Sequence, residues 1–239
     1  ESKMIYKGNY YAISPVKQIN NHLLVAGGRK GIILLQKSNN RWTEILHIDN
    51  LPDEVNNIYC PNPRTNNIST FKNYDKFGTD SIYLFATCWQ KGVLYVGITP
   101  DLKHYQLSHY DTSNGLPKDV HHITHLGNRV VFGTQKGLYR FISDKERFVP
   151  DTILGKNFAD GSTDVYRLVE VADDIVWLNA GAGNGIKCLI LQKGNNYLID
   201  TIPFLPIDIG QVNVIYPDPI LHGITWFGGV DGLVSYDAS

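Results

Sequence analysis

Short apolar runs alternate with polar turns along the whole chain, and five pairs of runs share one pattern. Each pair has a β-branched or aromatic stretch, a turn of small or polar residues, one glycine and a second apolar stretch. The five pairs occupy residues 24–35, 84–95, 130–141, 176–189 and 225–237. The runs have the length of strands, and none keeps the 3.6-residue apolar period of a helix. The pattern therefore predicts five β-hairpins.

These hairpins recur at a nearly constant interval. The second residue of each first run falls at positions 25, 85, 131, 177 and 226, so most intervals are about 46 residues. A V-x-x-I element precedes each hairpin, and a weaker aromatic strand follows most of them. Four short strands in a unit of about 46 residues are typical of a β-propeller blade. We name the strands of each unit A, B, C and D in chain order.

The repeat predicts an all-β fold, namely a β-propeller of five four-stranded blades forming a single domain over residues 1–239. The expected blades cover approximately residues 10–48, 52–111, 117–155, 162–204 and 209–239. The last unit lacks a strand D, which the apolar segment 3–8 can supply to give a complete ring closed by the N-terminal strand. The alternative is that these five blades are part of a larger propeller.

Two local features refine this picture. A glycine opens every strand C, because a tight B–C turn needs a residue that tolerates a positive φ. Residues 61–80 are an insertion that lengthens the A–B loop of the second unit and carries three aromatic side chains among polar ones. Long loops inside compact repeats are usually functional or disordered. We expect this one to contact a neighbouring domain or a second copy in a homodimer, because A–B loops lie opposite the D–A loops.

Charge and composition exclude several classes of protein. The chain has 22 Lys and Arg against 23 Asp and Glu, so it has no electrostatic basis for binding nucleic acid. A hydrophobic content of 43% is too high for a disordered chain. No apolar run approaches the roughly 20 residues of a membrane span. Three cysteines are too few for a disulfide scaffold.

The third and fifth units carry a more specific pattern. The third contains N-G-L-P at residues 114–117, then Val120 and Ile123, then V-F-G-T and G-L-Y-R-F up to residue 141. The fifth contains W-F-G at residues 226–228 and G-L-V-S-Y-D at residues 232–237. This resembles the two-component regulator propeller repeat, whose pattern runs N-G-L-P, V-x-x-I, L-W-x-G-T and G-L-x-R-Y-D. The other units match that pattern faintly.

The resemblance implies the periplasmic sensor region of a hybrid two-component histidine kinase, which detects oligosaccharides. In that family a transmembrane helix, a kinase and often a DNA-binding regulator follow the propellers, whose rings usually have seven blades. It therefore implies a periplasmic or extracytoplasmic module, anchored to the membrane through a longer parent. Any kinase activity would belong to that parent, so we expect no enzyme activity in this chain.

Polar residues in the B–C turns are the first candidates for ligand binding. Lys30, Lys91 and Lys136 each directly precede the glycine, Arg29 lies beside the first of them, and Asp231 lies in the last turn. In propellers the B–C and D–A loops share one face, where ligands often bind. The residues could form a ring of donors for an oligosaccharide or another small polar ligand. The alternative is that they are ordinary solvated turn residues.

A second group of candidates combines one turn tryptophan with the D–A loops. Trp89 lies in a B–C turn, where an exposed indole could stack on a sugar. Single polar residues precede the later A strands and would converge at a channel mouth; they are Glu54, Asp119, Asp164 and Gln211. Converging carboxylates also suit a glycoside hydrolase or lyase acting on polysaccharide, which is the alternative function. The alternative for these residues is turn capping that repeats from blade to blade. A third hypothesis for the chain as a whole is a non-catalytic protein-interaction scaffold.

Neither a metal nor a cofactor is expected. The three histidines His121, His122 and His125 fall on one strand A, and strand alternation places His122 on the opposite face from the other two. A metal site needs three or four converging ligands, and no second cluster at ligand spacing accompanies them. Trp177 and Trp226 occupy equivalent positions on strand B and are expected to pack in the core.

Overall fold

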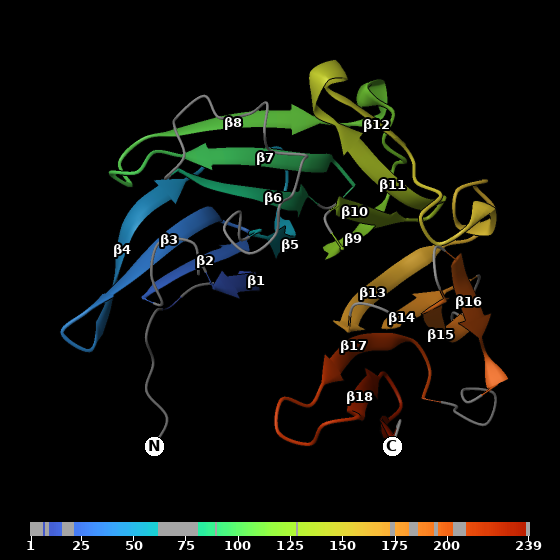
Figure 1. The fold of residues 1–239 in the computed structure, drawn as a ribbon. Helices are drawn as coiled ribbons and strands as arrows, with labels where there is room; N and C mark the ends of the chain where they lie inside the picture. Colours follow the sequence, from blue (N-terminus) through green and yellow to red (C-terminus); the bar gives the residue numbers. More distant parts are fainter. Residues whose placement is uncertain are drawn as a thin grey trace. The chain divides into compact units, whose positions relative to one another are not determined.

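The computed structural model describes residues 7, 10–15, 22–61, 81–88, 90–127, 129–172, 175–181, 186–193, 196–202 and 209–237. These residues form five antiparallel sheets, and in each sheet the strands are neighbours in chain order (Figure 1). The chain divides into two compact units. The first comprises Glu1–Ile123, Asn128–Val130 and Phe141–Phe148, and the second Thr124–Gly127, Val131–Arg140 and Val149–Ser239.

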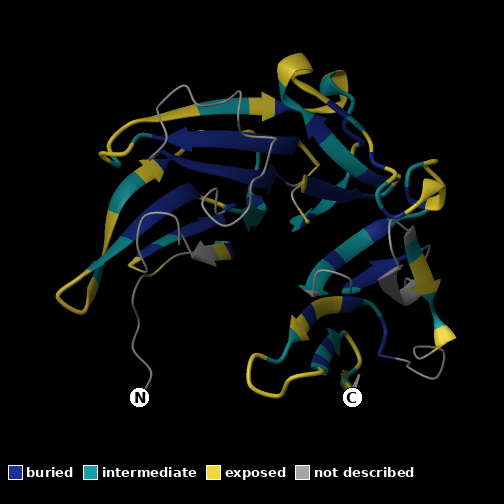
Figure 2. Ribbon diagram, viewed as in Figure 1, coloured by how far each residue is buried: buried dark blue, intermediate teal, exposed yellow. Residues whose placement is uncertain are grey.

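The first unit contains two complete four-stranded sheets. The first sheet consists of β1 (Tyr10–Pro15), β2 (Leu23–Gly28), β3 (Gly31–Ser38) and β4 (Arg41–Ile48). The second consists of β5 (Val55–Tyr59), β6 (Ile82–Cys88), β7 (Gly92–Ile98) and β8 (Tyr105–Tyr110). Every residue of β6 and β7 is buried, whereas β4 and β8 are largely half-buried or exposed (Figure 2). The central strands therefore carry the core.

The third sheet consists of β9 (Val120–Leu126), β10 (Arg129–Thr134), β11 (Gly137–Ile142) and β12 (Arg147–Pro150), and its residues are divided between the two units. The fourth consists of β13 (Val165–Ala172), β14 (Ile175–Ala180), β15 (Ile186–Lys193) and β16 (Asn196–Asp200). The last consists of β17 (Val212–Pro217), β18 (Ile224–Gly229) and β19 (Leu233–Asp237). Short 3₁₀ helices are η2 (Thr112–Asn114), η3 (Ser143–Lys145) and η4 (Lys156–Phe158).

The number of complete blades differs from the prediction. Four sheets have four strands, but the last has three among the described residues, so the expectation of five four-stranded blades is wrong. Within the last unit the described residues form strands A, B and C. The proposed closing strand 3–8 lies outside the described residues except at position 7, and the insertion lies outside them from residue 62 to residue 80.

The V-x-x-I element has a structural basis in a bulge. Residues three apart on a regular strand face opposite sides, because side chains alternate with a period of two. Strand A, however, shows a register shift after its first residue in β5, β13 and β17. The extra residue in the bulge therefore places the second apolar side chain on the same face of the sheet as the first. Accordingly Val165 and Leu168 share one core cluster, and Val212 and Ile215 share another.

The glycines that open strand C are required by both backbone conformation and packing. Gly31, Gly92 and Gly137 have φ values of 112°, 85° and 101°, which confirms the expected left-handed turn position in three units. In the fifth unit the expectation is wrong, because Gly232 does not have a positive φ. A Cβ atom at Gly31, Gly92 or Gly137 would also lie 2.1–2.2 Å from a main-chain carbonyl oxygen, that of Ile48, Tyr110 or Phe158. Each carbonyl belongs to the chain at or beyond the end of strand D. The B–C turn thus packs against the start of the D–A connection.

Candidate functional site

Three of the predicted ligand-binding residues line one hollow in the first unit. Its volume is about 400 Å³, and it is formed by the β2–β3 turn and the loop between β4 and β5. The lining residues are Arg29, Lys30, Gly31, Asn50, Leu51, Asp53 and Glu54. A B–C turn and a D–A loop therefore meet on one face, as the sequence predicted.

An ion pair crosses this hollow. Arg29 Nε donates to Glu54 Oε2 at 3.0 Å, and the two side chains keep 64% and 30% of their surface exposed. Exposed ion pairs of this kind contribute little to stability, so both groups can exchange partners at low cost. With Lys30 and Asp53 the hollow holds two cations and two anions. The hollow therefore offers a balanced set of donors and acceptors.

Local bonds hold the backbone of the hollow in place. Asn50 adopts a φ of 54°, a left-handed conformation that asparagine tolerates, and its amide donates to Asp49 Oδ1 at 3.0 Å. Asp53 Oδ1 accepts the backbone N–H of Glu54 at 2.8 Å, which orients that residue toward the turn. These local bonds set the loop without occupying the side chains of Arg29, Lys30 and Glu54.

A histidine that the sequence reasoning missed supports the turn from strand D. His47 Nε2 lies 2.9 Å from the carbonyl oxygen of Lys30, to which it can donate. The second sheet repeats the arrangement, because His109 Nε2 is hydrogen-bonded to the carbonyl of Lys91. In the pairing of strand C with strand D, His47 lies opposite Ile33 and His109 lies opposite Leu94. Each partner is three positions after the lysine of its own turn. The signal in the sequence is the repeated H-I-D and H-Y-D at residues 47–49 and 109–111.

The remaining candidates occupy equivalent places in other sheets. Lys136 lies in the β10–β11 turn, where its N–H donates to Thr134 Oγ1 at 3.1 Å. The carbonyl of Asp164 accepts from Gly181 at 2.7 Å, and the carbonyl of Gln211 accepts from Val230 at 3.1 Å.

Within the second unit, then, D–A residues are again bonded to B–C turns. Asp231 extends this contact, because its N–H lies 3.2 Å from the carbonyl oxygen of Ile209. Asp119 is half-buried just before β9 in the first unit. The four residues at the D–A positions fall in different units, so their convergence at a channel mouth stays a prediction. Trp89 lies outside the described residues.

The histidines and tryptophans lie in distinct surroundings. His122 Nδ1 lies 3.4 Å from the Asn57 amide nitrogen in the first unit, and His125 Nε2 lies 3.7 Å from Glu170 Oε2 in the second. Trp177 is buried at 2% exposure, as expected. Trp226 is half-buried rather than a core residue, and its indole N–H donates to Asp218.

The described residues contain neither a metal-binding cluster nor a membrane-spanning helix. Among them, no three His, Cys, Asp or Glu side chains are grouped so that they could hold a metal ion. Within the same part of the chain, no helix has the length and apolar character needed to cross a membrane.

No protein-family model matches the chain, and no curated protein matches its sequence. Among solved structures, the β-propeller domain of Cps50 (Swd1) from Myceliophteria thermophila superposes with a TM-score of 0.60 at 12% identity, over 96% of this chain and 70% of that one. The chain has a β-propeller fold. At this identity, the likeness shows the propeller fold alone.

Two further structures resemble the propeller. One is a chain of a mitotic checkpoint complex, with a TM-score of 0.56 and 12% identity over 91% of this chain and 59% of that one. The other is the extracellular domain of the hybrid two-component system BT4673 from B. thetaiotaomicron, with 18% identity and a TM-score of 0.49. The match covers 96% of this chain and 33% of that chain.

Proposed function

We propose that this propeller is a non-catalytic binding module whose ligand occupies the hollow between the β2–β3 turn and the β4–β5 loop. The observation that supports the proposal is the meeting of Arg29, Lys30 and Glu54 in one hollow. All three are side chains that the repeat had selected from the sequence. The class of ligand that suits them is an oligosaccharide or another small polar molecule.

The chemistry of the hollow favours a hydroxyl-rich ligand over a simple anion. A sugar hydroxyl both donates and accepts, so it can donate to the Glu54 carboxylate while accepting from Arg29 or Lys30. In the Arg29–Glu54 pair a donor lies 3.0 Å from an acceptor, so a ligand hydroxyl that reaches the pair can contact both groups. A purely anionic ligand would meet the two carboxylates that also line the hollow.

The biological role that we propose is ligand sensing in a longer, extracytoplasmic signalling protein. It rests on the two-component regulator propeller pattern at residues 114–141 and 226–237. Ligand binding can signal only if the ligand has different affinities for two states of the parent. The B–C turn is a suitable place for such a link, because its opening glycine packs against the D–A connection that leads to the next blade.

Calorimetric titration with a panel of neutral and acidic oligosaccharides tests the proposal. Arg29→Ala and Glu54→Gln should each weaken binding of the retained glycan roughly tenfold or more, as expected for hydrogen bonds to charged groups. Lys103→Ala is the control, because this exposed lysine lies in the β7–β8 loop away from the hollow. Full affinity in both hollow variants, or no binding of any glycan by the unaltered propeller, would refute the proposed site.

The same titration separates binding from catalysis. Intact oligosaccharide recovered after long incubation with the propeller supports a binding module. Cleavage products would instead favour the glycoside hydrolase or lyase alternative. In that case the carboxylates Glu54, Asp119 and Asp164 become the first to substitute, because hydrolysis of a glycosidic bond requires a pair of such groups.

A further inference from the structure

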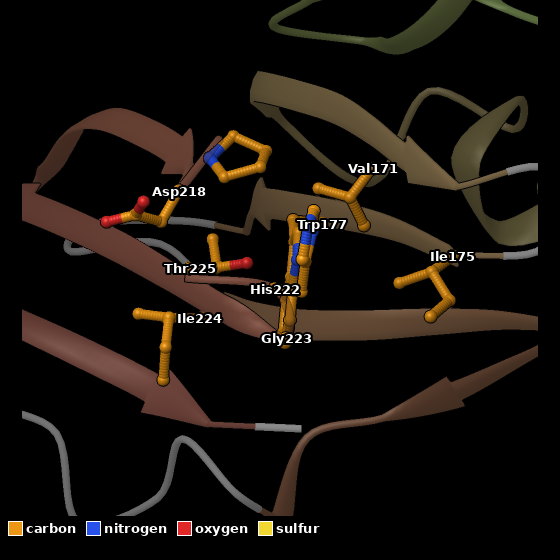
Figure 3. Close-up of a pocket in the computed structure, with 9 residues that line it drawn as sticks. Val171, Ile175, Trp177, Asp218, His222, Gly223, Ile224 and Thr225 are labelled. Carbon is orange, nitrogen blue, oxygen red and sulfur yellow. The ribbon is translucent and has the colours of Figure 1, made fainter. Parts of the chain in front are cut away.

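Exposed apolar side chains are concentrated in the fourth and last sheets, where most of those among the described residues belong to residues 198–233. Part of the apolar surface of these sheets is turned inward. Val171 and Ile175 of the fourth sheet and Ile224 of the last line a pocket of about 230 Å³ beside Trp177 (Figure 3). The fourth sheet has the order β13-β14-β15-β16, and its share of the pocket lies at β13 and β14. The outer strand β16 is at the other edge, and none of its residues lines the pocket.

Strand β16 exposes apolar side chains on both of its faces. Leu198 and Ile199 are neighbours in the sequence, so strand alternation sends them to opposite faces of the sheet. They keep 52% and 46% of their surface exposed, and Ile202 just beyond the strand keeps 73% (Figure 2). An apolar residue that is exposed on either side of an outer strand can be covered by a further strand that adds to that edge.

The outer strands of the first three sheets are better protected against such pairing than β16. Charged side chains and proline on an outer strand hinder the addition of another chain. The exposed residues of these three strands are mostly polar, charged or proline: Arg41, Thr43, Glu44 and His47 in β4, Tyr105, Gln106 and His109 in β8, and Arg147 and Pro150 in β12. The single charged residue of β16 is Asp200 at its end, whose carboxylate accepts the N–H of Ile202 at 3.0 Å.

The pairing of β16 with β15 determines which main-chain groups point outward. Lys193 lies opposite Asn196 with two residues between them, so this pair closes the hairpin with main-chain hydrogen bonds. Hydrogen-bonded and non-bonded pairs alternate along an antiparallel ladder, so Leu198, opposite Leu191, also bonds to β15. The N–H and C=O of Ile199 therefore point to the outer edge, where β16 adjoins no other strand of the described part of the chain.

We propose that two copies of this chain associate by pairing their β16 strands, antiparallel and about a twofold axis that passes Leu198. In this register Leu198 lies opposite Leu198 of the second copy, Tyr197 opposite Ile199, and Asn196 opposite Asp200. The main-chain groups of Ile199 then face the second copy, as an antiparallel ladder requires. An aromatic residue opposite a β-branched one stabilises such a pair, and no two like charges are opposite each other.

A second copy suits this edge because β16 is complementary to itself in that register. A shift of one residue is incompatible with the alternation of bonded pairs, and a twofold axis at Ile199 would place Asp200 opposite the apolar Leu198. A contact of this kind uses the same surface patch on both copies. It is small, so we expect a weak, reversible dimer. The inference is independent of the function proposed for the hollow, and it uses a different surface from the insertion at residues 61–80.

Analytical ultracentrifugation of the full chain from about 1 µM to 1 mM tests the association. We expect the average mass to rise from one chain toward two. Ile199→Lys should remain a monomer over the whole range, because it places a charge on the pairing edge. Ile220→Lys is the matched control, since Ile220 is 81% exposed in the same unit but lies outside β16, and it should dimerise like the unaltered chain. Amide exchange at Ile199 should slow at least tenfold at concentrations where the dimer prevails.

A cysteine on the twofold axis tests the register. Two residues at position 198 form a non-bonded pair with Cα atoms roughly 4.5 Å apart, within the range of a disulfide. In a Cys188→Ser background, Leu198→Cys should therefore form a cross-linked dimer under mild oxidation, as measured by non-reducing electrophoresis. Asp200→Cys should not, because the two copies of residue 200 lie about 13 Å apart along the strands.

Three results would overturn the inference. They are a monomer at every concentration, an undiminished dimer in Ile199→Lys, and cross-linking through Asp200→Cys in place of Leu198→Cys. Circular dichroism checks that each variant is folded. If Ile199→Lys does not fold, the cross-linking pattern and the exchange of the Ile199 amide decide.

Discussion

Replacing Gly137 with alanine tests why a glycine opens strand C. Gly137 has a φ of 101°, and a Cβ atom there would lie 2.2 Å from the carbonyl oxygen of Phe158. Gly155 provides a matched control in the same unit. Its φ is 106°, but an added Cβ would meet nothing within 4 Å. The two substitutions therefore share the backbone strain and differ in the steric overlap.

The expected losses follow from these two terms. A residue other than glycine is strained at a positive φ by about 1–3 kcal/mol, and both variants incur a cost of this kind, although Gly155 combines its φ of 106° with a ψ of 166°. Overpacking a well-packed site costs about 1–3 kcal/mol more, and only Gly137→Ala incurs it. The entropy that alanine removes from the unfolded chain is the same in both variants and cancels in the comparison. Gly137→Ala should therefore be the less stable variant by about 1–3 kcal/mol.

Equilibrium unfolding in urea measures this difference. With an m-value of about 2 kcal/mol/M, the midpoint of Gly137→Ala should lie roughly 0.5–1.5 M below that of Gly155→Ala. The m-value itself should not change, since neither substitution alters the surface exposed on unfolding. Equal midpoints would show that the close carbonyl of Phe158 does not constrain the turn, and that φ alone explains the glycine.

Three further predictions use other parts of the propeller. Burial raises the pKa of Cys60 and Cys88 to about 12. In a Cys188→Ser background, a thiol reagent at pH 8 should label the buried Cys88 only after unfolding. The stability that depends on these protonated thiols should be complete below about pH 9 and decline toward pH 12. Glu170→Ala should destabilise the second unit by about 1–3 kcal/mol in thermal unfolding, because its carboxylate accepts a backbone N–H of the β9–β10 turn at 3.0 Å. Hydrogen bonds from the hydroxyl and the backbone N–H of Ser113 lower the pKa of Asp111. The stability that this carboxylate contributes should be present above about pH 4 and disappear as the pH falls further. Acid unfolding of Asp111→Ala, compared with the unaltered chain, measures it.

Much of the fold could be predicted because its determinants are local. Each B–C hairpin is encoded by two apolar runs and a glycine within about a dozen residues, so the strand pairs could be located from the sequence. The bulge in strand A was encoded equally locally, in the three-residue spacing of Val165 and Leu168. That spacing is inconsistent with a regular half-buried strand, and it could have been interpreted as a bulge. The number of complete blades is not determined locally, because the last sheet has three strands among the described residues and its fourth was expected from the distant segment 3–8.

The candidate sites show the same division between local and distant determinants. Arg29 and Glu54 could be assigned to the same face in advance, because B–C and D–A loops share one face of a blade, but their ion pair could not. The roles of His47 and His109 depend on which strand D residue lies opposite the turn, and strand register fixes this only in three dimensions.

The short loops of the hollow determine what it can contribute. The B–C turns are short, because a tight hairpin allows few residues, so the hollow obtains its chemistry from exposed side chains such as Arg29 and Lys30. An exposed ion pair is not fixed for one partner, so it can adapt to many hydroxyl arrangements. We therefore expect tolerance of glycan structure in the hollow at Arg29.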